Sequence, residues 1–149
     1  MIKVSDLSFS YNQDDEALRK VNVAIEKGSW VSILGHNGSG KSTLSKCLVG
    51  LLAPTSGTIT IDGMEMNEEN LPKIRKKIGI VFQNPDNQFV GVTVKHDIAF
   101  GLENQCLSPE EMTHKIMHYA KLVGMEDFLG KEPHQLSGVQ KQIVAIAVA

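Results

Sequence analysis

Hydrophobic and polar residues alternate over the first part of the chain. Residues 2–27 alternate in short stretches that are interrupted by a polar turn over residues 12–16. This period is typical of half-buried strands, so the sequence predicts an antiparallel β subdomain here. A further short strand over residues 58–61 is followed by Asp62 and Gly63, a pair that indicates a hairpin.

Two apolar runs differ from this alternating pattern. Residues 30–34 and 78–82 are each almost continuously apolar and predict strands, and the run at 78–82 predicts a strand that is buried on both faces. After the first run, the spacing of the apolar residues changes to three and four. This spacing predicts a helix from Lys41 to about Leu52 with a core-facing stripe of Leu44, Cys47, Leu48 and Leu51. The basic stretch over residues 68–77 is interpreted as a solvated helix face.

The remaining sequence indicates helices. Residues 94–102 predict a short helix, and a longer one begins with Ser108 as N-cap, Pro109 and Glu111, and stops at Gly124. Ser137 caps a final helix whose residues are apolar nearly all round. The predicted fold is therefore α/β, with a core formed by 1–83 plus 136–149 and a helical subdomain over 84–135.

Composition narrows the class of protein. The chain has 149 residues, 42% of them hydrophobic, and a net charge of −2 with both signs interspersed, so nothing indicates nucleic-acid binding. It contains neither a signal-peptide pattern nor an apolar run of membrane-spanning length, which is typical of a soluble cytoplasmic protein. Cys47 and Cys106 are interpreted as buried free thiols. His114 and His118 lie four residues apart, but a solvated helix face is favoured over a metal pair because no third ligand is evident.

The strongest chemical signal is a glycine-rich segment between the run at 30–34 and the helix from Lys41. Glycines let successive backbone N–H groups point into one concavity, and a helix N-terminus favours anions. The segment therefore predicts a phosphate loop, with Lys41 reaching the β- and γ-phosphates of a nucleotide and Ser42 completing a Mg²⁺ coordination shell. Asp62 follows an apolar strand as a Mg²⁺-binding aspartate would, but the hairpin is favoured. The phosphate loop comprises Gly35, His36, Asn37, Gly38, Ser39, Gly40, Lys41, Ser42 and Thr43.

These features together resemble a known family. The phosphate loop, Gln83 after an apolar strand, the helical insertion and Leu-Ser-Gly-Val-Gln at 136–140 are similar to the nucleotide-binding subunit of an ABC transporter. The resemblance implies a P-loop NTPase fold with a RecA-like ABC ATPase core. Residues 82–90 and 100–104 resemble more narrowly the ATPase subunits of energy-coupling factor (ECF) transporters.

The resemblance also implies an activity and partners. It implies an ATP-hydrolysing motor that uses ATP and Mg²⁺ and drives the uptake of a vitamin or a metal ion. Such a subunit pairs with a second ABC ATPase subunit and with an integral membrane component, as a peripheral protein on the cytoplasmic face of the cell membrane. The alternatives are a truncated, non-catalytic nucleotide-binding module and, less favoured because of the 84–90 stretch, a soluble ABC ATPase without a transporter.

Roles for single residues follow from the same resemblance. Lys41 and Gln83 match catalytic positions, and Gln83 together with Ser42 matches the Mg²⁺ ligands. Tyr11 matches the aromatic residue that stacks on adenine, although it could simply end a strand. Ser137, Gly138 and Gln140 match the signature motif that contacts the γ-phosphate of ATP bound by the opposite subunit.

The sequence departs from the family pattern in three places. Val139 replaces a second glycine, where a β-branched side chain would hinder close approach to the phosphate and disfavour a positive φ. Ile143 stands where the family usually has arginine, so a charge-assisted contact is lost. Nothing after Ala149 supplies the Mg²⁺-binding Asp, the catalytic Glu or the switch His of the family. The chain is therefore expected to be C-terminally truncated, to bind nucleotide weakly and to be inactive in hydrolysis on its own.

Overall fold

The computed structural model describes residues 1–12, 15–103 and 107–149, and the chain divides into two compact units. The first unit is Met1–Gly79 and the second is Ile80–Ala149. Each is described below by itself. The turn predicted over residues 12–16 lies partly outside the described residues. Cys106 lies outside them altogether.

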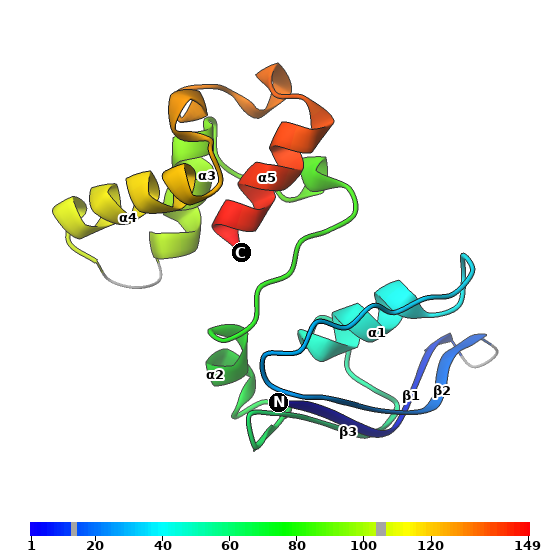
Figure 1. The fold of residues 1–149 in the computed structure, drawn as a ribbon. Coiled ribbons are helices and arrows are strands. Elements are labelled where there is room, and N and C mark those ends of the chain that lie inside the picture. Colours follow the sequence, from blue (N-terminus) through cyan, green and yellow to red (C-terminus); the bar gives the residue numbers. More distant parts are fainter. Residues whose placement is uncertain (13–14, 104–106) are drawn as a thin grey trace. The chain divides into compact units, whose positions relative to one another are not determined.

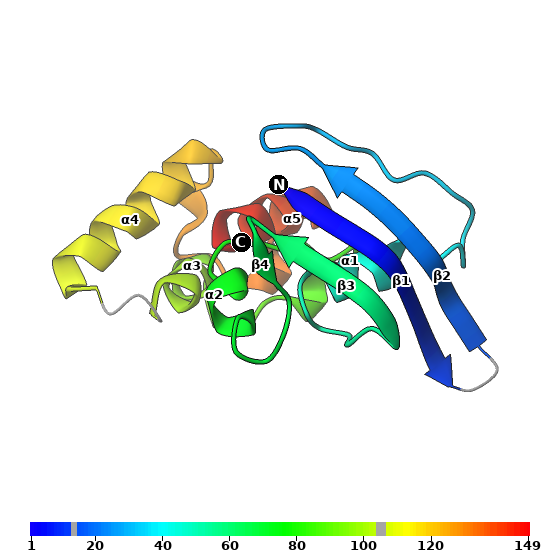
Figure 2. The same ribbon diagram turned by 90° about the horizontal axis from the view of Figure 1, so that it is seen from below.

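The first unit is built on an antiparallel sheet in which the strand order is β2-β1-β3-β4 (Figures 1 and 2). The prediction of a β subdomain is confirmed, and so is the hairpin at Asp62, which joins the last two strands and takes a φ of 48°. Its carboxylate pairs with the Met1 amine and with Lys77, and these two cations hold the pKa of Asp62 below its usual value. The strands are β1 (Ile2–Asn12), β2 (Asp15–Ile25), β3 (Ser56–Ile61) and β4 (Met64–Glu65).

One irregularity in β1 explains how its two alternating stretches share a core face. Val4 and Leu7 are both buried although they are an odd number of residues apart. The pairing of β1 with β2 shifts register between them, and Asp6 adopts a φ of 47°. A bulge inserts one residue and restores the facing of the side chains. Leu7 and Phe9 therefore point to the same side as Val4.

Helix α1 (Lys41–Leu48) lies over one face of this sheet (Figures 1 and 2). Its Leu44 and Cys47 enter the core formed by the strands, and burial raises the pKa of the Cys47 thiol. The predicted end near Leu52 is wrong, because Gly50 takes a φ of 67° and the chain leaves the helix there. The basic stretch forms only one short helix, α2 (Leu71–Arg75).

The two apolar runs are not strands, so both predictions are wrong. Residues 30–34 and 78–82, all of them described, have extended or irregular backbone. A strand exists only through hydrogen bonds to a neighbouring strand, and neither run has such a neighbour within the described residues. Trp30 and Leu34 are consequently 95% and 89% exposed.

The second unit consists of helices packed around a core that includes Val94, Ile98, Ile116 and Val144. The capping box predicted at Ser108 is present, and the longest helix ends before Gly124 as predicted. The elements are η1 (Pro85–Asn87), α3 (Val94–Glu103), α4 (Pro109–Leu122), η2 (Glu126–Phe128), η3 (Pro133–Gln135) and α5 (Gly138–Val148).

Helix α5 packs against α3 and α4 within this unit. The assignment of residues 136–149 to one ATP-binding core together with 1–83 stays a prediction. Over the described residues, no helix is long and apolar enough to cross a membrane.

Candidate functional site

The phosphate loop has the backbone geometry that its glycines predict. Gly38 and Gly40 adopt φ values of 85° and 86°, in the left-handed region that other residues rarely enter. Gly40 is also the N-cap of α1, and it offers no side chain to the first N–H groups of the helix. Those groups have no intrahelical acceptor, so the loop presents backbone donors and the positive end of a helix dipole together.

Gly40 is fixed from the other side by the sheet. A Cβ atom at this position would lie 2.6 Å from the carbonyl oxygen of Ala17 and 2.9 Å from Leu18 Cδ2, both in β2. The N-cap of the helix is therefore held against the sheet at a separation that only glycine permits.

The ammonium group of Lys41 points back into the loop. Its Nζ donates to the carbonyl oxygens of Gly35 and His36, at 2.7 Å each, and lies 3.4 Å from Ser39 Oγ. Ser39 N also donates to the His36 carbonyl, and His36 Nδ1 lies 2.8 Å from the carbonyl oxygen of Asn37. A cation held among backbone groups at a helix N-terminus is suited to bind an anion such as a phosphate.

Tyr11 lies beside this loop, as its predicted role requires. Its hydroxyl group is 3.0 Å from Thr43 Oγ1, and its ring packs edge-on against Phe9 with the centroids 4.9 Å apart. Thr43 is buried, whereas Tyr11 is 54% exposed. The end of β1 therefore presents an aromatic ring next to the first turn of α1 with much of its surface free.

The other predicted residues lie in the second unit, around α5. Ser137 is the N-cap of this helix, and its Oγ accepts a hydrogen bond from Gln140 N at 3.3 Å, while Gln140 Oε1 accepts one from Ser137 N at 2.8 Å. The hydroxyl group of Ser137 can still donate, and Gly138 lies in the first turn with its N–H free of an intrahelical acceptor. This helix start could therefore also receive an anion.

Val139 lies within α5, and its φ is not positive, so the backbone strain expected from a valine here is absent. Its side chain is 70% exposed at the helix start, and the expected hindrance to an approaching phosphate stays a prediction. Ile143 packs against the apolar core of the second unit.

Gln83 belongs to the same unit as α5. Its side chain is exposed, and its carbonyl oxygen accepts a hydrogen bond from Gln142 Nε2 at 3.5 Å. The structure thus brings Tyr11 to the phosphate loop, and Gln83 to the helix that begins at Ser137. The two groups belong to different units.

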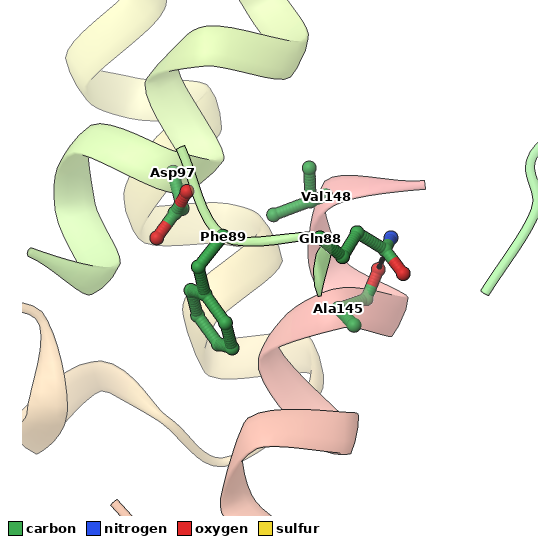
Figure 3. A pocket seen from close by; sticks show the side chains of 5 residues that line it. All are labelled: Gln88, Phe89, Asp97, Ala145 and Val148. Atoms are coloured by element: carbon green, nitrogen blue, oxygen red, sulfur yellow. Dashed lines mark hydrogen bonds between the residues drawn. The ribbon is translucent and has the colours of Figure 1, made fainter. Parts of the chain in front are cut away.

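Two residues near Gln83 were missed by sequence reasoning. Gln88 Oε1 accepts from Phe82 N at 3.1 Å, and its Nε2 donates to the carbonyl oxygen of Ile80 at 3.3 Å. The same Nε2 also donates to the carbonyl oxygen of Ala145 at 3.5 Å (Figure 3). Two of these partners are only six and eight residues away, whereas Ala145 is 57 residues away and could not be paired with Gln88 from the sequence.

Asp97 is the second missed residue. It is 3% exposed and lines a pocket together with Gln88 and Phe89 (Figure 3). Its Oδ1 accepts from the backbone N–H groups of Val90 and Gly91 at 2.8 Å each. An acidic residue in the first turn of a predicted helix was the signal that could have found it.

The histidine pair on α4 was the other candidate for a metal site considered in the sequence. Among the residues that the structure describes, no group of three or more His, Cys, Asp and Glu side chains could hold a metal ion. The side chains of His114 and His118 on α4 are both exposed, in agreement with the predicted solvated helix face, and the ring of His118 lies edge-on to Tyr119 at 5.5 Å.

Comparison with known proteins identifies the family. Residues 18–149 match the family described as ABC transporter. The chain belongs to this family. It is 59% identical over 149 residues to the energy-coupling factor transporter ATP-binding protein EcfA1 of Mycoplasmopsis synoviae (strain 53), covering 99% of this chain and 56% of that protein. The chain thus spans about half the length of the curated relatives it matches.

Solved structures of ABC proteins agree with this assignment. CbiO1 from Clostridium perfringens, part of the ABC transporter complex cbiONQ, has a TM-score of 0.87 at 39% identity, covering 99% of this chain and 59% of that one. The ATP-binding cassette MJ0796, in a dimeric post-hydrolysis state bound to ADP and Pi, has a TM-score of 0.88 at 34% identity and coverage of 99% and 68%. The predicted ABC ATPase fold and the resemblance to ECF transporter ATPases are confirmed.

Proposed function

We propose that this chain binds ATP with Mg²⁺ at its phosphate loop and forms part of the motor subunit of an ECF importer. The observation that carries the proposal is the Lys41 ammonium group, which lies inside a loop whose glycines open backbone donors at the start of α1. The relatives named as ECF transporter ATP-binding proteins support the transport role.

Within the phosphate loop, each residue has a distinct task. The N–H groups at the start of α1 bind phosphate oxygens, and Lys41 exchanges its contacts with the Gly35 and His36 carbonyls for the β- and γ-phosphates. The hydroxyl group of Ser42 would hold the Mg²⁺ ion, and the role of Gln83 as a second Mg²⁺ ligand rests on the family resemblance alone. Bound Mg²⁺ supplies neutralisation of the charge that develops on the phosphates during transfer.

Tyr11 orients the base. Its exposed ring stacks on adenine, while the hydrogen bond to Thr43 fixes the ring relative to α1. Stacking uses the face of the ring system that every base possesses, so this contact contributes affinity with little selectivity.

The start of α5 serves the second subunit of a dimer. Ser137, Gly138 and Gln140 contact the γ-phosphate of ATP held by that subunit, and Gln83 senses the nucleotide in its own subunit. The exposed side chain of Val139 at this position hinders the approach of the phosphate. The proposed partners are a second ABC ATPase subunit and an integral membrane component. In this proposal the chain lies peripherally on the cytoplasmic face of the membrane, and the cargo is a vitamin or a metal ion.

The test compares ATP binding and turnover by the purified chain with those of Lys41→Ala. The matched control is Lys46→Ala, which removes the same charge from the last turn of α1. Lys41→Ala should lose at least about tenfold in ATP affinity, because one charge-assisted contact to phosphate is removed, while Lys46→Ala stays within about twofold.

Each outcome decides between the alternatives. Binding without turnover, both sensitive only to Lys41, would favour the non-catalytic module, for which the exposed Val139 is the structural argument. Equal ATP affinity in all three proteins would refute the phosphate-loop proposal.

A further inference from the structure

The boundary between the two units leaves Gln83 with α5. The second unit begins at Ile80, so the segment that carries Gln83 is part of the same compact body as the helix that begins at Ser137. If the segment around Gln83 is rigidly joined to α5, a ligand that binds the Gln83 side chain would also change the orientation of α5.

Three side chains make this connection. Lys141 Nζ lies 2.6 Å from Asp86 Oδ1, Gln142 Nε2 donates to the Gln83 carbonyl, and Gln88 Nε2 donates to the Ala145 carbonyl. Lys141 and Ala145 are one turn apart on the same face of α5. The 83–88 segment is thus attached along the first two turns of the helix.

The ion pair is the strongest of these contacts. The distance of 2.6 Å between Lys141 Nζ and Asp86 Oδ1 is short for a charge-assisted hydrogen bond. The Lys141 side chain is only 17% exposed, whereas that of Asp86 is 59% exposed. Screening by water is weaker for such a partly covered pair than for an exposed one.

Hydrogen bonds within the 83–88 segment also restrain the backbone around Asp86. Asn84 accepts a hydrogen bond from Asp86 N at 3.1 Å and caps η1, and Pro85 is buried. Gln88 fastens the other end of the turn to the backbone at Phe82 and Ile80. Asp86 is therefore presented from a rigid turn that lies three residues after Gln83, while Lys141 lies four residues after Ser137.

We propose that Asp86 and Lys141 are a positioning pair that transmits the nucleotide-dependent position of Gln83 to the start of α5 in the same subunit. The inference rests on the proposed function, since it requires Gln83 to sense one ATP and Ser137 to contact the ATP of the partner. The pair touches neither nucleotide. It makes the occupancy of one composite site alter the geometry of the other.

The experiment uses the full-length subunit assembled with its partner ATPase and membrane component. Asp86→Asn and Lys141→Met should each lower ATP turnover at saturating ATP at least about fivefold and bring the Hill coefficient to 1, the scale expected for a coupling between sites. ATP affinity measured on the isolated subunit should change less than about twofold, because the phosphate loop is intact. The exchange Asp86→Lys with Lys141→Asp should restore turnover and cooperativity in part.

The control removes an ion pair of similar distance that joins only neighbouring residues. Arg19 Nε lies 2.7 Å from Glu16 Oε2 within β2, so Glu16→Gln should change neither turnover nor cooperativity. Thermal unfolding followed by circular dichroism shows whether each variant is folded, because Asp86 and Lys141 lie outside the unit that carries the phosphate loop.

The inference is overturned if Asp86→Asn and Lys141→Met behave as Glu16→Gln does, or if the charge exchange restores nothing. Failure of the proposed function has a different signature, because Lys41→Ala would then leave the turnover of the assembled protein unchanged.

Discussion

Among the positions of the phosphate loop, we expect Gly40 to tolerate substitution least. Its φ is 86°, and an added Cβ would lie 2.6 Å from the carbonyl oxygen of Ala17. The left-handed conformation alone costs a non-glycine residue about 1–2 kcal/mol. Displacing the β2 backbone to remove the contact adds about 1–3 kcal/mol. Gly40→Ala should therefore lower the free energy of unfolding by about 2–5 kcal/mol.

Two other glycines separate these contributions. Gly38 and Gly63 have φ values of 85° and 78°, and an added Cβ at either position meets no atom within 4 Å. Gly38→Ala and Gly63→Ala should therefore cost only the conformational part, about 1–2 kcal/mol. Gly38 lies in the same loop as Gly40, so it also controls for effects on nucleotide binding.

Urea unfolding followed by far-ultraviolet circular dichroism measures the three differences, and equilibrium binding of ATP with Mg²⁺ measures the functional effect. Gly40→Ala should weaken ATP binding more than Gly38→Ala, since only the former displaces the start of α1. If Gly40→Ala and Gly63→Ala destabilise the chain equally, within about 0.5 kcal/mol, the contact with β2 does not constrain the loop.

Three further predictions concern single side chains. Asp97→Ala should lower the free energy of unfolding by about 2–5 kcal/mol because the backbone N–H groups of Val90 and Gly91 lose their charged acceptor, and Asp97→Asn, which keeps one oxygen, should lower it by less; equal thermal shifts would contradict this. Hydrogen bonds from Ser108 hold the pKa of Glu111 below its usual value, so its contribution to stability is present above about pH 4.5 and lost as the pH falls through the folded pKa. Glu111→Gln should flatten that part of the stability curve in acid titrations, and an unchanged slope would exclude the effect. Tyr11→Phe should keep ATP affinity within about twofold, whereas Tyr11→Ala should lose about 1–3 kcal/mol of stacking, measured by equilibrium binding; equal losses would show that the hydroxyl group acts instead of the ring.

Structural features that are formed by residues close together in the sequence were predictable. The capping box at Ser108 needs only residues three apart, and the hairpin at Asp62 needs only its two turn residues. The phosphate loop is of the same kind, because its glycines and Lys41 lie within a few residues of one another.

Features whose cause is distant in sequence were not predictable. The run at 30–34 has the composition of a buried strand, but composition does not supply a hydrogen-bonded neighbour. Gln88 was missed for a related reason, since its contact with the Ala145 carbonyl spans 57 residues. Asp97 differs, because it contacts Val90 and Gly91, which are close in sequence, and its place in the first turn of α3 was a local signal. The ion pair between Lys141 and Asp86 was not predictable either, because the two residues are 55 positions apart in the sequence.

The phosphate loop keeps its geometry although residues 30–34 before it are unpaired, and this indicates where its support lies. Gly40 lies against β2, Leu44 enters the sheet core from the first turn of α1, and Tyr11 at the end of β1 holds Thr43. All three contacts act after Ser39, on the helix side of the loop. The antiparallel sheet therefore orients α1 and the donors at its start, and an exposed Trp30 does not disturb them. The β subdomain is then part of the nucleotide site through position as well as through the Tyr11 ring, so substitutions that loosen β1 from β2 should weaken nucleotide binding without touching the loop itself.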